Sequence, residues 1–383
     1  MADGLFLLAS MRETETPALR KIQIREVRIM KNKLFCAVLV PILFFALSST
    51  SRAQEVIKLK CSIFFPSVHF QVDLMNQFAK DLKERTKGRV EMTNYAGGTL
   101  VPPDRAFDGA VQGLSDLALI ATGMNPGRFP VSEILEIPLG FPSAWVAGHV
   151  IDDVSKKFKM KEYDKVHLIW IWSCPPSIFT SVHKPIKTLE DIKNLRIRGI
   201  GRTNQVVNAL GAAAIPLPSS DTYEALRKGI IEGMYTPMET SKGYKYADII
   251  RYATASYKIS VAGTFALIMN KEKFDSLPAD IKKIFEDLYT EYFNKQLPMW
   301  NQSDIDGREF FKSKGGTLYY LTDAESNRWI KAVEPVIEDY KKYLVTKGFT
   351  QKEADDLIQF AQERIPYWVK MEKQQKIATA YEY

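Results

Sequence analysis

The segment with the clearest potential for binding chemistry is LRIRG, at residues 195–199. Its alternation indicates a short strand with Arg196 and Arg198 on one face and Leu195 and Ile197 on the other. A guanidinium group is planar, permanently charged and able to donate two parallel hydrogen bonds, so it matches a carboxylate better than an ammonium group does. The segment therefore suggests a carboxylate-binding arginine, although two surface arginines on an exposed edge strand would give the same pattern.

Motifs typical of enzymes and of nucleotide or metal sites do not occur in the sequence. Gly199-Ile-Gly201 begins like a dinucleotide-binding fingerprint, but no third glycine follows at the required spacing. There is no G-x-S-x-G, H-E-x-x-H or P-loop motif, and the three cysteines form neither a C-x-x-C pair nor a cluster with the four histidines. We expect no catalytic residue, no metal and no cofactor.

Aromatic side chains occur near the ends of the expected strands, where open α/β sheets bind their ligands. Four of them are candidates to line such a site: Phe65, Trp172, Phe179 and Tyr235. Aromatic residues in strands more often belong to the core, which is our interpretation of Trp170, so we expect one or two of the four to contact a ligand. His69 begins the first helical region after Pro66, and it is either a contact for a bound anion or a helix N-terminal residue near solvent.

Strand-like and helix-like segments alternate in two successive runs. The first run predicts strands at 56–65, 90–95 and 117–121 and helices at 72–83 and 106–112. The second predicts strands at 165–173, 195–199 and 214–217 and helices at 204–210 and 220–228. This order is typical of βαβ units, and two such runs predict two lobes with a cleft between them. Periodic apolar residues beyond Pro278 predict a long helix toward Lys314, which Pro298 should kink or end.

Composition and charge exclude several classes of protein. A 383-residue chain with 46% hydrophobic and 25% charged residues has enough apolar material for two globular domains. The net charge is +7, but residues 1–53 hold eight Lys/Arg and four Asp/Glu, so the rest of the chain carries about +3 without a basic block. We therefore expect no binding to DNA or RNA.

The basic N-terminus is interpreted as part of a secretion signal. From Met30 the chain reads MKNK, continues with the apolar run LFCAVLVPILFFAL, and places Ser51 and Ala53 at the −3 and −1 positions of a cleavage site. A spanning helix needs about 20 apolar residues, so we expect cleavage, with a mature start near Gln54, rather than a membrane anchor. The polar segment before Met30 leaves open whether translation starts there or at Met1.

Two cysteines follow the expected cleavage site. Cys61 and Cys174 could pair in an oxidising compartment. Both lie in apolar, strand-like runs, so we expect two separate buried thiols.

Several short motifs, in order and spacing, resemble those of the solute-binding proteins of tripartite ATP-independent periplasmic (TRAP) transporters. The main ones are PIKTLEDIKNLRIR at 185–198, PLP at 216–218, DTYEAL at 221–226 and GIIEG at 229–233. The resemblance implies a two-lobed α/β fold of the periplasmic binding protein type, with a ligand cleft between the lobes, hinge strands and a long helix spanning both. By analogy, the chain divides into an N-terminal extension and signal peptide at 1–53, a first α/β domain at 54–175 plus 264–303, and a second at 176–263 plus 304–383.

The resemblance also implies roles for individual residues. Arg198 stands at the position of the family's carboxylate-clamping arginine, whereas Arg196 is expected at the surface. Tyr235 stands where oxo-acid-binding members have a metal-ligating glutamate, which argues against a metal-bridged ligand. Thr236 stands where sialic-acid-binding members have an asparagine, and it either donates a hydrogen bond to the ligand or packs as an ordinary strand residue. A second arginine of some members falls near Ile178 here.

The function implied is capture of a small organic acid anion in the periplasm by a monomer that delivers it to the TRAP membrane permease. One clamping arginine and aromatic surroundings predict a monocarboxylate with an apolar or aromatic body. Two alternatives remain open: a binding module for a sensor or another type of transporter, and a secreted enzyme with an unrecognised site.

Overall fold

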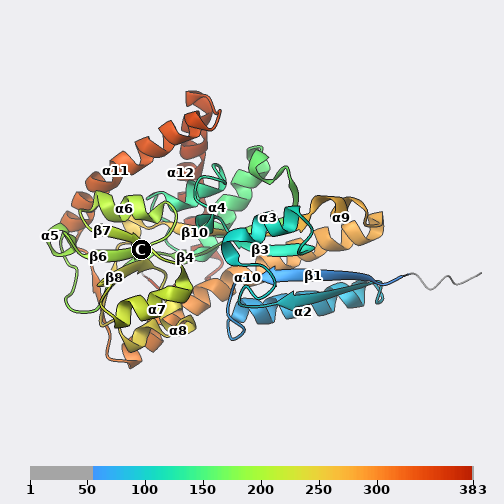
Figure 1. The fold of residues 1–383 in the computed structure, drawn as a ribbon. Coiled ribbons are helices and arrows are strands. Elements are labelled where there is room, and N and C mark those ends of the chain that lie inside the picture. The colour runs from blue at the N-terminus through green and yellow to red at the C-terminus, as the bar shows by residue number, and fades with distance from the viewer. Residues whose placement is uncertain (1–54, 382–383) are drawn as a thin grey trace, which may run out of the picture. The chain divides into compact units, whose positions relative to one another are not determined.

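The computed structural model describes residues 55–381 of the chain. The expected signal peptide and the mature start near Gln54 lie outside the described residues. From Val56 onward the chain forms one unit, in which two separate β-sheets are flanked by helices (Figure 1).

Every strand and helix expected from the sequence is present, with its ends within three residues of the expected ones. The strands are β1 (Ile57–Ile63), β2 (Val90–Tyr95), β3 (Leu117–Ala121), β4 (Val166–Pro176), β5 (Ile178–Ser181), β6 (Arg196–Gly199), β7 (Ala213–Pro216), β8 (Gly233–Thr236), β9 (Tyr252–Ala255), β10 (Ala262–Asn270) and β11 (Thr317–Tyr320). The α-helices are α2 (Phe70–Arg85), α3 (Ala106–Val111), α4 (Ala144–Lys157), α5 (Leu189–Ile192), α6 (Thr203–Ala209), α7 (Ser219–Arg227), α8 (Glu239–Gly243), α9 (Lys271–Asp275), α10 (Ala279–Ser313), α11 (Asp323–Thr346) and α12 (Gln351–Gln374).

The first sheet has five strands in the order β2-β1-β3-β10-β4. β1 is parallel to both β2 and β3, whereas β10 runs antiparallel to both of its neighbours. All residues of β3 are buried, as expected of a central strand covered on both faces. α2 packs along β2, and α4 and α10 pack against β4.

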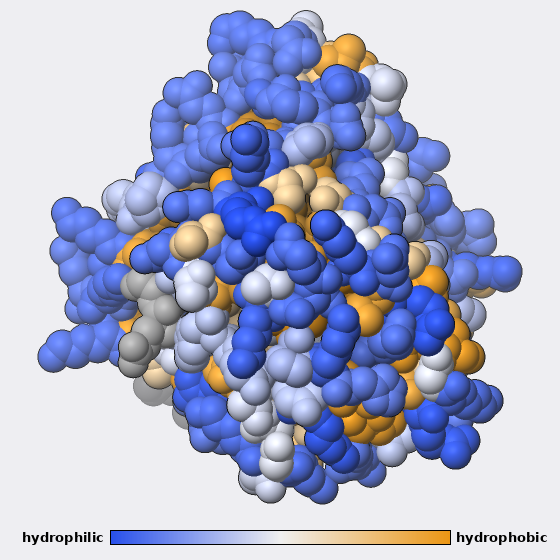
Figure 2. All heavy atoms as spheres, turned by 90° about the vertical axis from the view of Figure 1, so that its left-hand side faces the viewer, coloured by the Kyte–Doolittle hydropathy of each residue, from blue (hydrophilic) through white to orange (hydrophobic). Residues whose placement is uncertain are grey.

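The second sheet has six strands in the order β11-β9-β5-β8-β6-β7. β6 is parallel to β7 and β8, while β5 is antiparallel to β8 and β9. Apolar clusters cover both faces of this sheet, one with α6 and α11, the other with α7 and the end of α10. Toward α5 and α11, the surface is largely hydrophilic with smaller hydrophobic areas between (Figure 2).

The chain passes between the two sheets through very short connections. β4 ends at Pro176 in the first sheet and β5 begins at Ile178 in the second. The chain returns to the first sheet where β10 begins at Ala262. The Ser177 amide donates a hydrogen bond to the carbonyl oxygen of Val261 at 2.8 Å, so the two connections between the sheets are hydrogen-bonded to each other. The predicted domain ranges remain predictions.

The long helix beyond Pro278 is present as α10, which continues through Pro298 to Ser313. The expectation that Pro298 could end this helix is therefore wrong. The proline lies between the buried side chains of Leu297 and Trp300, so tertiary packing holds the helix where propensity alone would break it. α12 packs against α4, beside the first sheet, although the predicted division assigned residues 304–383 to the second domain. None of the helices in residues 55–381 is long and apolar enough to cross a membrane.

Candidate ligand-binding site

Arg198 is almost completely buried, with 4% of its surface exposed. Its Nε donates to the carbonyl oxygen of Leu217 at 3.0 Å, and its Nη2 donates to Ser219 Oγ at 3.2 Å. Burial lowers the pKa of the guanidinium, and Tyr246 and Tyr244 oppose this shift. No carboxylate within residues 55–381 forms an ion pair with Arg198. Because a buried cation without a counter-ion is costly, this position favours binding of an anion.

Tyr244 and Tyr246 lie near Arg198. Their rings stack with centroids 5.6 Å apart, and the Tyr246 hydroxyl donates to the backbone oxygen of Ser219 at 2.9 Å. Burial raises the pKa of Tyr246 to about 12, while the charge of Arg198 lowers it and that of Glu239 raises it. The pKa of Tyr244 is also raised by burial, and the same two charges act on it. Both hydroxyls therefore lie within range of the charges of Arg198 and Glu239.

Glu239 begins α8 and faces His69 at the start of α2. Glu239 is 7% exposed and His69 is 3% exposed. Glu239 Oε2 lies 3.5 Å from His69 Nε2, yet the geometry is not that of a hydrogen bond and Nε2 has no other partner. His69 caps α2, because its Nδ1 accepts a hydrogen bond from the Gln71 amide at 3.2 Å. His69 is thus buried, and the interpretation of a residue near solvent was wrong.

Aromatic side chains pack around His69 at the end of β1. Phe65 stacks on the imidazole with centroids 4.2 Å apart and meets Phe265 edge-on at 5.5 Å. Trp300 of α10 packs against both Phe65 and His69. Phe65 is itself buried, whereas Phe64, whose ring is tilted against that of Phe65 with centroids 4.1 Å apart, is partly exposed. Phe64 is therefore a partly exposed apolar side chain that a ligand could contact at the end of β1.

The loop that follows Arg198 is anchored by two buried carboxylates. Glu133 and Glu136 lie in the 3₁₀ turn Ser132–Glu136. Glu133 Oε2 accepts from Arg202 Nε at 2.5 Å, and Glu136 Oε2 accepts from the Arg202 amide at 3.1 Å. Burial raises the pKa of Glu136 to about 7, with a smaller contribution from the charge of Glu133. These contacts fix the β6–α6 loop, and hence the end of the strand that carries Arg198.

The structure does not place Phe179 and Tyr235 beside Arg198. Their rings stack on each other with centroids 4.2 Å apart, and the Tyr235 hydroxyl donates to the backbone oxygen of Ile259 at 3.1 Å. Arg198 pairs with Met234 of β8, so the Arg198 side chain shares a sheet face with Met234. Tyr235, the next residue, and its partner Phe179 lie on the opposite face. Thr236, two residues beyond Met234, shares the face of Arg198 and is 5% exposed.

Of the remaining residues considered in the sequence, the two tryptophans and the two cysteines are buried and Arg196 is exposed. Trp172 and Trp170 are both buried in the first sheet, the former beside Phe265. Arg196 is exposed, as expected, and pairs with Glu232 at 3.6 Å. Cys61 and Cys174 are buried free thiols, as the sequence indicated.

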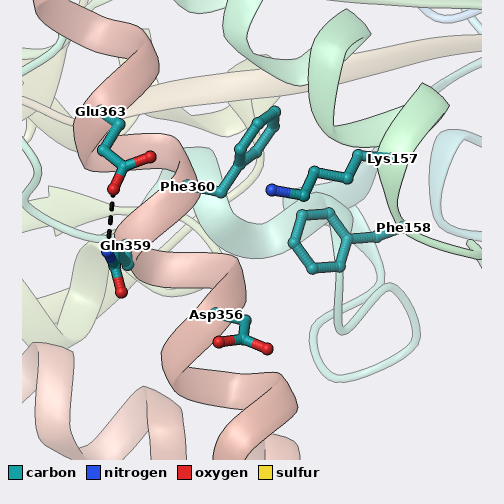
Figure 3. A pocket seen from close by; sticks show the side chains of 6 residues that line it. All are labelled: Lys157, Phe158, Asp356, Gln359, Phe360 and Glu363. Atoms are coloured by element: carbon teal, nitrogen blue, oxygen red, sulfur yellow. Dashed lines mark hydrogen bonds between the residues drawn. The ribbon is translucent and has the colours of Figure 1, made fainter.

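A hollow of about 320 Å³ lies between the end of α4 and α12, away from Arg198 (Figure 3). Lys157 Nζ lies 3.9 Å from the centre of the Phe360 ring there, and Gln359 donates to Glu363 at 2.8 Å. No group of three or more His, Cys, Asp or Glu residues within the described part of the chain could hold a metal ion.

Sequence reasoning missed Glu239, Ser219, Tyr244 and Tyr246. A weak signal was available, because an acidic residue and two tyrosines follow β8 within about ten positions, at the end of the sheet where ligands bind. Periodicity could not show that α8 folds back toward the start of α2.

The family model described as bacterial extracellular solute-binding protein, family 7, matches residues 62–343. The chain belongs to this family. A solute-binding protein of Albidiferax ferrireducens is 25% identical over 267 residues, which cover 68% of this chain and 78% of the relative. The crystal structure of a TRAP periplasmic solute-binding protein from Desulfovibrio salexigens is similar with a TM-score of 0.72 and 29% identity, over 81% of this chain and 96% of that one.

A second similar structure is a TRAP solute-binding protein from Rhodoferax ferrireducens in complex with benzoate. Its TM-score is 0.76 at 22% identity, over 82% of this chain and 99% of the other. The two-lobed α/β fold expected for this family 7 protein is confirmed by these likenesses.

Proposed function

We propose that this protein is the solute-binding subunit of a TRAP transporter and that it captures a small organic acid anion at Arg198. The observation that carries the proposal is the buried guanidinium without a counter-ion in the described residues. Its remaining donor capacity is suited to a carboxylate, which would replace the lost hydration of the cation. Closure of the two lobes over the anion, followed by delivery to the membrane permease, is what membership of the family supports.

The ligand proposed is a monocarboxylate with an apolar or aromatic body. Phe64 offers a partly exposed ring next to Phe65, and the position of the second arginine of some family members is Ile178 in this chain. Structures with the same fold include proteins complexed with benzoate and with mandelate. Thr236 is a further candidate hydrogen-bond donor on the same sheet face.

The proposed setting is the periplasm. It rests on the family description as extracellular and on the signal-like N-terminus, which lies outside the described residues. No catalytic step, cofactor or metal is part of the proposal, and the protein is proposed to act as a monomer with the permease subunits as partners.

Titration calorimetry on Arg198→Ala tests the anion site. Removing one partner of a buried charged pair costs about 2–5 kcal/mol, so affinity for the best acid from a panel should fall by roughly 30-fold to several thousand-fold. Arg198→Lys should recover only part of this loss, because an ammonium cannot form the bidentate pair. Arg196→Ala is the matched control, since it removes an exposed arginine two residues away on the same strand.

Circular dichroism should show that all three variants are folded. Unchanged affinity in folded Arg198→Ala would refute the site. A large loss in Arg196→Ala alone would move the anion contact two residues upstream.

A further inference from the structure

Glu239 and His69 each have a hydrogen-bonding group without a partner among the described residues, and together these groups point to a ligand. The Glu239 carboxylate accepts no hydrogen bond from the other described residues, although Glu239 is 7% exposed. Its neighbour Asp304 shows the usual solution, because Asp304 Oδ1 accepts from the Glu239 amide at 3.0 Å. A largely buried carboxylate that accepts no hydrogen bond from the chain is stabilised by a donor from outside it.

The protonation of His69 follows from its cap. Since Nδ1 accepts from the Gln71 amide, the neutral ring carries its proton on Nε2. This N–H lies 3.5 Å from Glu239 Oε2 and has no hydrogen-bond partner. The two buried groups thus present one acceptor and one donor at almost the same point.

A hydroxyl group satisfies both. Its proton can be donated to Glu239 while its oxygen accepts from His69 Nε2, because two atoms 3.5 Å apart can both be about 2.8 Å from one oxygen. An ammonium group has no lone pair for His69, and an ether oxygen has no proton for Glu239. The glycine at 243 keeps this flank free, because a Cβ there would lie 3.2 Å from Glu239 Oε2 and 3.5 Å from His69 Cδ2.

This pair of groups belongs to the same region as the anion site. The charges of Arg198 and Glu239 both act on the hydroxyls of Tyr244 and Tyr246, and Tyr244 follows Gly243 directly. The cation that lacks a counter-ion and the carboxylate that accepts no hydrogen bond from the described residues therefore lie near the same two tyrosines. A ligand extending past these tyrosines would meet a positive group at one end and the Glu239–His69 pair at the other.

We propose that the ligand is a hydroxy acid whose hydroxyl, remote from the carboxylate, donates to Glu239 and accepts from His69 Nε2. The inference rests on the proposed function, because it takes the carboxylate to be bound at Arg198. It makes Glu239 and His69 specificity-determining residues.

Calorimetry with matched probes tests the inference. The probes are benzoate, phenylacetate and hexanoate, each compared with its hydroxylated form: 3-hydroxybenzoate, 3- and 4-hydroxyphenylacetate, and 6-hydroxyhexanoate. The methyl ether of the best hydroxy acid completes the set. A charge-assisted hydrogen bond should make at least one hydroxy acid roughly 10- to 100-fold tighter than its parent, and the methyl ether should lose this gain.

Three variants locate the effect. Glu239→Gln and His69→Asn should each reduce the ratio of the affinity for the hydroxy acid to the affinity for its parent acid by about tenfold or more. Asparagine is a good N-cap, so His69→Asn keeps the start of α2. Glu232→Gln, which alters a carboxylate beside Arg196, is the control and should leave the preference intact.

The outcomes separate the two proposals. If no hydroxy acid binds more tightly than its parent, or if Glu239→Gln keeps the full preference, the inference is overturned even though Arg198→Ala abolishes binding. If Arg198→Ala leaves binding of all the acids unchanged, or if no probe binds, the anion site itself fails and the inference falls with it.

Discussion

Replacing Arg202 with alanine should destabilise the protein far more than breaking an exposed ion pair. Arg202 is 7% exposed and Glu133 is 1% exposed, and their charged atoms are 2.5 Å apart. The guanidinium also lies 3.7 Å from the centre of the Tyr343 ring. Removing it leaves the Glu133 carboxylate buried without its cation, which costs about 3–5 kcal/mol of unfolding free energy.

Arg128→Ala is the matched control. Arg128 pairs with Asp108 at 2.6 Å, but the two side chains are 36% and 48% exposed, so the expected loss is below about 1 kcal/mol. Equilibrium urea unfolding, followed by tryptophan fluorescence, measures both variants. A difference of less than about 1 kcal/mol between them would refute the reasoning from burial.

A double variant tests whether the cost comes from the orphaned carboxylate. Arg202→Met combined with Glu133→Gln removes both charges, and replacing a buried pair by neutral groups is often nearly neutral. The double variant should therefore be more stable than Arg202→Met alone. Equal stability would mean that the charge on Glu133 is not the reason for the loss.

Two further predictions concern close packing and pH. Gly307→Ala would place a Cβ 2.6 Å from Glu239 Cα, against the backbone of α8, so urea unfolding should show a loss of about 1–3 kcal/mol. In Gly148→Ala the three atoms nearest the new Cβ all belong to the side chain of Leu297 rather than to backbone, so the loss should be smaller. The reverse order would contradict the prediction. Burial raises the pKa of Glu136 from 4.5 to about 7, so as the pH rises Glu136 loses its proton in the unfolded chain before it does so in the folded one. The free energy of unfolding should therefore fall as the pH rises from about 4.5 to about 7. Glu136→Gln should make this fall shallower, and an unchanged slope would count against the assignment.

The position of Arg198 could be predicted because it depends on local pattern. LRIRG fixes which side chains share a strand face, and the motifs around it place that strand within the family. Local pattern could not predict whether Phe179 and Tyr235 lie beside Arg198. Both lie near strand ends as expected, but their distance from Arg198 depends on the register of β8 against β6, in which Met234 pairs with Arg198. Register between strands distant in sequence is not encoded in either strand alone.

The His69–Glu239 contact could not be predicted from the sequence. The two residues are far apart in the chain, and they meet because α8 packs closely on α10, where Gly307 lets the helices approach. Pro298 shows the opposite case. A strong local rule predicted a kink or a helix end there, and the helix continues past the proline, beside the buried side chains of Leu297 and Trp300.

The position of β10 has a consequence for the order in which the chain can assemble. β4 has a single neighbour in the first sheet, and that neighbour is β10, which is synthesised after β5, β6, β7, β8 and β9 of the second sheet. Until Asn270 has been made, β4 has no partner strand and β3 is paired on one edge only, with β1. Unpaired edges of apolar strands can form wrong pairings. Pairing over such long sequence separations is slow. A ribosome-bound chain ending before Ala262 therefore cannot complete its first sheet, and no single cut divides the chain into two halves that each contain a whole sheet.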